Sequence, residues 1–263
     1  MRKSWLLLVA CAAAAILAAA RPTAASAFLQ PPGEGQLITT LRFSRADAGF
    51  GASGRLKSGA FYSKAEIQAY AEYGIAEWAT LVFAPSVMHL HVKAAPPPGY
   101  TGLGDSELAA RVRVLAYGPA IVSLQAGVLT RGDVAGFGHR GLPGKAALQG
   151  DIRLLAGLGF ACGPFACFAD AQAGYRSHVA QAGSEIRADL TLGLRPVPDV
   201  LLLAQSFSSL SRGAVRTESH KLQLSAIYDF SKHWSFQLGL FATVLGRNAP
   251  RERGVLSAVW LRF

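Results

Sequence analysis

The feature that most constrains the fold is an alternation of apolar and polar residues, which recurs in segments of about ten residues along most of the chain. Within residues 106–117, for example, Leu108 and Val112 fall on one face of an extended strand, while Glu107 and Arg111 fall on the other. Successive side chains of a strand point to opposite faces, so such a segment suits hydrocarbon on one side and water on the other. Repeated many times, this pattern is typical of a transmembrane β-barrel.

The spacing of these segments predicts the topology. We expect twelve strands, near residues 36–45, 63–74, 78–92, 105–117, 120–131, 148–160, 167–177, 185–195, 200–208, 218–230, 234–245 and 255–263. The connections alternate between short turns and longer loops, as in outer-membrane barrels. We therefore predict a closed, all-β, antiparallel barrel with short periplasmic turns and longer extracellular loops. A secreted β-sandwich also alternates, but the asymmetry of the connections favours the barrel.

Two of the expected strands do not fit the pattern well. Pro85 interrupts the strand near 78–92, so its faces are not assigned. The strand near 200–208 is apolar on both faces. The last strand ends on an aromatic residue, Phe263, which resembles the signal that the barrel-assembly machinery recognises in its clients. If the barrel closes, this strand must pair with the strand near 36–45.

The start of the chain predicts export. A short positive segment, Met1-Arg-Lys3, precedes a long apolar run, and Ala25-Ser-Ala27 matches the small-residue cleavage pattern of a Sec-type signal peptide. The predicted domains are a cleaved signal over residues 1–27 and a barrel domain over residues 28–263. We expect the mature protein in the outer membrane of a Gram-negative bacterium. No later segment is apolar over about 18 residues, so no transmembrane helix is predicted.

Two cysteines remain after the signal, Cys162 and Cys167, and they flank a Gly-Pro turn. Cysteines that face each other across a tight hairpin lie about 4.5–5.5 Å apart at Cα, which is within disulfide range. An exported protein also reaches an oxidising compartment. We therefore predict a disulfide between Cys162 and Cys167.

The polar face of the strands gives the candidate lumen residues. They carry charges of both signs, and they are Glu66, Glu72, Glu107, Arg111, Arg113, Asp151, Arg153, Asp170, Arg176, Arg187, Asp189, Arg195, Lys221 and Asp229. These side chains could line a conduit or a binding lumen, or they could form interior salt bridges that plug the barrel. Barrels of eight strands are filled by side chains and barrels of sixteen leave a channel, so a size of twelve leaves both alternatives open.

The predicted long connections lean basic, in a chain with a formal net charge of +10. The candidate anion-binding residues of these loops are Arg212, Arg216, Arg247 and Arg251. They would suit the phosphates of lipopolysaccharide or an acidic polysaccharide, and the alternative is ordinary solvated loop charge. Nucleic acid is a poor partner for an exported barrel. The expected partners are outer-membrane lipid, the assembly machinery and small solutes.

The sequence offers little for catalysis. Ser206 and His220 could meet on the outer face of neighbouring strands, near Asn248, as an acyl hydrolase would need, and outer-membrane phospholipases are twelve-stranded barrels with such residues. Polar rim residues are the more economical interpretation. His89 and His91 share one face but lack a third ligand for a metal. We expect no enzyme and no cofactor.

A resemblance adds to this interpretation. The segments that carry it are Ala27–Thr39, Tyr73–Leu81, Gly102–Arg111, Arg187–Gly193, Leu203–Phe207, His220–Ser225 and Gly246–Ala249. Across them the chain resembles the XagA-like family of exported proteobacterial proteins. The Gly-Leu-Gly-Asp element at 102–105 is also similar to outer-membrane proteins of meta-pathway phenol degradation, which are regarded as transporters. The resemblance implies either transport or a surface role in adhesion, autoaggregation or exopolysaccharide handling, and it implies no catalytic residues.

Overall fold

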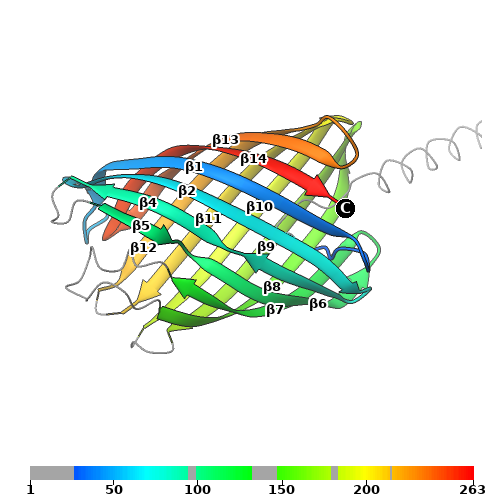
Figure 1. Cartoon of the computed structure of the whole chain (residues 1–263), viewed down its shortest axis with the longest axis horizontal. Helices are drawn as coiled ribbons and strands as arrows, with labels where there is room; N and C mark the ends of the chain where they lie inside the picture. The colour runs from blue at the N-terminus through cyan, green and yellow to red at the C-terminus, as the bar shows by residue number, and fades with distance from the viewer. Residues whose placement is uncertain (1–26, 94–98, 132–146, 179–182, 214) are drawn as a thin grey trace, which may run out of the picture.

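The computed structural model describes residues 27–93, 99–131, 147–178, 183–213 and 215–263. Their strands form one antiparallel sheet that closes on itself as a tilted barrel (Figure 1). The strands are β1 (Gly35–Phe50), β2 (Leu56–Ala76), β3 (Ala79–Ala84), β4 (Ser86–Val92), β5 (Gly99–Leu103), β6 (Ser106–Tyr117), β7 (Ala120–Arg131), β8 (Ala147–Cys162), β9 (Phe165–His178), β10 (Ser184–Val197), β11 (Val200–Arg212), β12 (Thr217–Asp229), β13 (Trp234–Arg247) and β14 (Ala249–Arg262).

These strands make twelve traverses of the barrel wall, as predicted. Strands β3 and β4 both pair with β2 and form one traverse, which is interrupted at Pro85. Proline has no N–H to donate to a neighbouring strand, so the ladder breaks there. Strands β5 and β6 form the next traverse, interrupted at Gly104 and Asp105. The two interruptions lie side by side, because the Gly104 N–H donates to the Ser86 carbonyl at 2.8 Å.

The strands extend further than the alternation predicted. Strands β1 and β2 continue to Phe50 and from Leu56, so most of the loop expected over 46–62 is paired sheet. Likewise β13 and β14 leave only Asn248 between them, with a positive φ of 49°. Strand β11 also continues to Arg212. Arg212, Arg247 and Arg251 therefore lie in strands, which corrects their assignment to loops. Ladder hydrogen bonds do not require alternating polarity, so pairing continues beyond the part of the wall that the apolar pattern marks.

The two ends of the barrel sequence meet at one seam. Strand β14 pairs with β1 from Gln36 opposite Arg262 to Phe50 opposite Ala249. Beyond the strand, the Gly35 N–H donates to the Phe263 carbonyl at 2.7 Å, and the Phe263 N–H donates to the Gly35 carbonyl at 3.0 Å. This confirms that the last strand pairs with the first and closes the barrel.

Deleting Phe263 should lower the yield of inserted barrel without changing what the surviving barrels conduct. The deletion removes two seam hydrogen bonds and an exposed aromatic ring at the closing edge, but it leaves the register of β14 intact. Pulse-labelled membrane fractions and heat-dependent gel mobility would measure the folded fraction. Tyr117→Ala, which removes another exposed aromatic ring of the barrel, serves as the control. An unchanged yield would remove Phe263 from any role in assembly.

The outer surface of the barrel is apolar. Large hydrophobic side chains such as Leu108, Leu190, Leu224 and Leu240 point outward and are 44–65% exposed. Aromatic residues are exposed near the end of the barrel where the chain terminates: Tyr73, Trp78, Tyr228, Phe230, Trp234 and Phe263. A continuous apolar band with an aromatic girdle matches lipid rather than water. No helix among the described residues is long and apolar enough to span a membrane.

The predicted disulfide is present. Cys162 and Cys167 are joined across the β8–β9 turn, with a Cα–Cα distance of 5.9 Å. Gly163 in this turn has a φ of +63°, a left-handed conformation that glycine adopts at no steric cost. The bridge therefore fastens a turn that the backbone already favours.

Candidate functional site

The candidate site is the interior of the barrel, and its most buried element is an ion pair between β2 and β6. Glu72 and Arg111 lie 2.9 Å apart and their side chains are only 2% and 1% exposed. Tyr70 joins them, because its hydroxyl donates to Glu72 at 2.7 Å and accepts from Arg111 at 3.1 Å. Arg111 also donates to the side chain of Gln125 at 3.0 Å. The desolvated charges are thus satisfied by one another and by neutral neighbours.

From this pair, a chain of polar contacts runs along the wall through β7 and β8. Gln125 donates to Glu107 at 2.7 Å. Glu107 then pairs with Arg153 at 3.1 Å, and Arg153 pairs with Asp151 at 2.6 Å. Arg113, two residues after Arg111, is exposed. The chain therefore holds the predicted lumen residues of three strands in fixed positions.

The same chain continues onto β9 and β10. Arg176 lies 3.1 Å from Asp151 and 3.8 Å from Glu185. Arg187 lies 3.9 Å from Glu185 and 3.5 Å from Asp189. We call the charged residues that make these contacts the charged wall: Glu72, Glu107, Arg111, Asp151, Arg153, Arg176, Glu185, Arg187 and Asp189. All of them were predicted except Glu185, which was missed because it is the first residue of the expected strand.

A second cluster spans the seam, around Glu252 of β14. Lys221 lies 2.6 Å from Glu252 and Lys64 lies 3.5 Å from it. The Ser44 hydroxyl donates to Glu252 at 2.7 Å, and Lys64 also lies 3.2 Å from Glu66. The prediction included Glu66 and Lys221 but missed Glu252, because residues 246–254 were expected to form a loop.

A third cluster lies at the end of the barrel where the chain terminates. Asp229 lies 2.8 Å from Arg195 and 3.3 Å from Arg262. The hydroxyl of Ser235 also donates to Asp229. Asp229 and Arg195 were predicted to face inward, and they meet here across β10 and β12. This cluster fixes the short turns against one another.

The interior is not polar throughout. Six buried apolar side chains from β1, β11, β12 and β14 form one cluster, against which Tyr70 and Phe168 pack: Ile38, Leu201, Leu203, Ile227, Ala258 and Trp260. We call this set the apolar wall. Sequence reasoning missed it, although the strand near 200–208 gave a signal in being apolar on both faces. The lumen therefore has a charged side and an apolar side.

The segment before β1 enters this lumen. Ala27 is fully buried, its N–H donates to Asp170 at 2.6 Å, and its carbonyl accepts from Ser123 at 2.6 Å. The next carbonyl, that of Phe28, accepts from Arg111 at 3.2 Å. Residues 27–30 are thus held by side chains of the barrel wall rather than by a strand ladder. The predicted signal peptide lies outside the described residues except for Ala27.

The far end of this segment is held in the same way. The Gln30 N–H donates to the hydroxyl of Thr80 at 3.0 Å, and its side-chain amide donates to Glu72 at 2.9 Å. Pro32 then bridges to Gly74, where a Cβ would lie only 2.1 Å from the Pro31 carbonyl. We call residues 27–31 the inner segment. It crosses the lumen near the short-turn end of the barrel.

The predicted loop arginines are less available than expected. Arg216 lies 2.6 Å from Glu218, and Arg247 lies 3.4 Å from the same carboxylate. Arg212 and Arg251 are exposed. Because Glu218 neutralises part of this charge, the four residues do not form one unpaired cationic surface.

The serine that faces His220 is Ser208 and not Ser206. The ladder pairs Ser208 with His220, whose Nδ1 lies 3.0 Å from the Ser208 hydroxyl, and it pairs Ser206 with Leu222. This corrects the expected Ser206–His220 pair, because the strand register is shifted by two residues. His89 contacts Thr101 at 2.6 Å. No group of three or more possible metal ligands occurs among the described residues.

Comparison with known proteins gives the fold a context. No protein-family model matches the chain, and no curated protein matches its sequence. An outer-membrane channel of Pseudomonas putida F1 is 15% identical, with 92% of this chain and 100% of that chain covered at a TM-score of 0.67. The fold is that of an outer-membrane β-barrel.

Two further barrels show how general this fold is. The NanC porin is 7% identical, with 84% of this chain and 98% of that chain covered at a TM-score of 0.52. The translocator domain of the autotransporter NalP from Neisseria meningitidis is 11% identical, with 89% and 90% covered at 0.52. At such identities the likeness shows the fold alone, and the XagA-like resemblance stays a prediction.

Proposed function

We propose that the protein is an outer-membrane channel for small solutes, whose passage is limited by its own inner segment. The observation that carries the proposal is the contrast between the two surfaces of the wall. The outside is an apolar band, while the inside holds a chain of paired charges from Glu72 to Asp189. This is the arrangement of outer-membrane barrels that enclose a polar lumen.

The charges of the interior are already paired, which bears on what could pass. The charged wall offers dipoles and partly satisfied ion pairs rather than a free charge of one sign, so it would not retain an ion strongly. The apolar wall includes Leu203, Ile227 and Trp260, which are buried beside Tyr70 and Phe168. Once the inner segment is displaced, solutes with one polar and one apolar side would find a partner on each wall. The resemblance to transporters of aromatic degradation supports the same class of function.

The inner segment could act as a barrier that leaves the lumen. The predicted cleavage after Ala27 would remove the two bonds of that residue, to Asp170 and Ser123. The mature segment would keep three hydrogen bonds to side chains of the wall, to Arg111, Thr80 and Glu72. Each such bond contributes on the order of 1 kcal/mol net. The segment could therefore leave the lumen at far lower cost than any strand could leave the sheet.

Liposome swelling and planar-bilayer recording would test the proposal. We expect the purified protein to give discrete conductance steps and to admit small amphipathic solutes more readily than sugars of equal size. The heat-denatured protein in the same detergent is the control for leak. If the folded protein admits no solute and gives no steps above the bare bilayer, and an inner-segment deletion does not open it, the channel proposal fails.

A further inference from the structure

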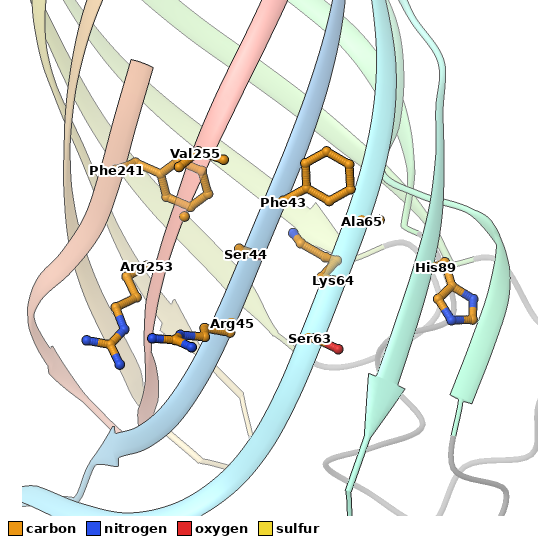
Figure 2. A pocket seen from close by; sticks show the side chains of 11 residues that line it. Phe43, Ser44, Arg45, Ser63, Lys64, Ala65, His89, Phe241, Arg253 and Val255 are labelled. Carbon is orange, nitrogen blue, oxygen red and sulfur yellow. The ribbon is translucent and has the colours of Figure 1, made fainter. Parts of the chain in front are cut away.

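A groove of about 600 Å³ lies on the barrel around the seam, between β13 and β4. Its residues come from five neighbouring strands, and Figure 2 shows them spread over β13, β14, β1, β2 and β4. The strand register arranges the outward-facing residues of the groove in two rows across the wall, while the inward-facing Ser44 and Lys64 between these rows belong to the Glu252 cluster. One row is mainly apolar, and the other, two residues closer to the long-connection end, is cationic. Neither row belongs to the lumen contacts described above.

The apolar row is centred on Phe43. This residue lies opposite Val255 on β14 and opposite Ala65 on β2, and Ala65 in turn lies opposite His89 on β4. Phe43 and Val255 are 50% and 48% exposed, so they point out of the barrel with the lipid-facing band. Ala65 is small and leaves a hollow between the larger side chains of Phe43 and His89. The row therefore forms an apolar seat open to the membrane.

The cationic row lies two residues further along the strands, toward the long-connection end. Arg45 is directly opposite Arg253 on one side and opposite Ser63 on the other. Figure 2 shows both guanidinium groups on the same side of the apolar seat, below Phe43 and Val255 in the view. Like charges placed directly opposite each other on a sheet repel and destabilise it. Such a pair is stabilised when an anion lies between the two groups.

One of the two arginines has a protein partner and the other has none. Arg253 forms an ion pair with Asp47. The side chain of Arg45 makes no hydrogen bond or ion pair with any residue that the structure describes, and Arg45 is exposed. Arg251 adds a further exposed cation two residues along β14. With Asp47 counted, three arginines face one carboxylate, so the row keeps a positive charge.

The depth of the two rows in the membrane follows from strand geometry. Arg45 lies ten residues after Gly35, where β1 begins at the short-turn end. At about 3.3 Å per residue and a tilt of roughly 45°, this places Arg45 about 23 Å above that end. The apolar band of an outer-membrane barrel is about 25 Å tall. The Phe43 row therefore lies in the outer leaflet, and the arginines lie at its headgroup level.

We propose that this groove binds the phosphorylated, acylated glycolipid of the outer leaflet, lipopolysaccharide, through its lipid A part. Arg45 and Arg253 hold a glucosamine phosphate between them, and an acyl chain lies along Phe43, Ala65 and Val255. Arginine is suited to bidentate contacts with phosphate. The site lies on the outside of the wall and so is independent of the channel proposal.

Binding of purified lipid A to the refolded barrel in detergent micelles tests the proposal. For Arg45→Ala we expect the dissociation constant to rise about tenfold, and for Arg45→Ala with Arg253→Ala more than that. Arg45→Lys should recover part of the loss. The control is Arg113→Ala, which removes an exposed arginine from β6, near the short-turn end of the barrel. Because Arg45 has no described partner, its variant should keep the heat-dependent gel mobility of the folded barrel.

The choice of ligand separates the sources of phosphate. Lipid A lacking its phosphates should bind the wild type as weakly as bisphosphorylated lipid A binds the double variant. Inorganic phosphate alone should not compete at millimolar concentration. Equal affinity for phosphatidylglycerol would show a general anionic-lipid surface and overturn the glycolipid assignment. Unchanged lipid A affinity in the folded Arg45→Ala and double variants, or an equal loss in Arg113→Ala, would overturn the site.

Discussion

Replacing Arg111 with alanine should lower the free energy of unfolding by about 3–5 kcal/mol, the cost of leaving a buried charge without its partner. Glu72 would stay 2% exposed with its counterion gone, and Gln125 and Phe28 would each lose a hydrogen-bond donor. Urea titration of the barrel in lipid vesicles, followed by tryptophan fluorescence, would measure the loss. A shift of the midpoint without a change in slope would show a loss of stability alone.

The matched control for this variant is Arg113→Ala. It removes the same side chain from the same strand, two residues away, at an exposed position. We expect it to change the free energy of unfolding by less than about 0.5 kcal/mol, as is usual for surface sites. A double variant, Glu72→Gln with Arg111→Met, removes both charges and should recover most of the loss. If Arg111→Ala and Arg113→Ala were equally stable, the pair would contribute nothing to the barrel.

A barrel refolded without residues 28–30 should conduct several-fold more than one that begins at Phe28, the first residue after the predicted cleavage. The deletion removes the backbone that crosses the lumen and leaves Arg111, Thr80 and Glu72 without the bonds that they make to it. These groups could then contact water. Single-channel recordings of the two chains in the same lipid would measure the change.

A milder variant distinguishes a barrier from a scaffold. Thr80→Val keeps the shape of the side chain but removes its bond to the Gln30 N–H. We expect it to leave the mean conductance near that of the parent and to add brief open events, because only one anchor is loosened. Equal conductance in the deleted and intact chains would mean that the inner segment does not limit the pathway.

The fold was predictable because the membrane imposes a simple rule on each strand. Lipid requires apolar side chains at every second position, so even segments as short as 106–117 reveal their faces. The closing pair was predictable from the same rule, since a barrel has no free edge. Strand ends were not predictable, because beyond the lipid band ladder pairing places no demand on side-chain polarity. For this reason the extension of β13 and β14 to Asn248 was missed.

The interior was predictable in composition but not in partnership. Alternation identified Arg111 and Glu72 as inward residues, yet these residues lie on strands that are not neighbours along the chain. Their pairing depends on β3, which lies between β2 and β6 in the sheet and ends at the interruption at Pro85. The inner segment was missed for a different reason. It has no periodic pattern, and only hydrogen bonds to partners as distant as Asp170 reveal its position.

The seam between β1 and β14 also sets the order of events in assembly. A lumen exists only after the last strand to leave the export machinery meets the first. The inner segment, which leads directly into β1, has nothing to enclose it until that moment. The wall therefore closes and the inner segment becomes enclosed in the same step. Until β14 has paired with β1, the N-terminal residues are accessible to proteases in the periplasm.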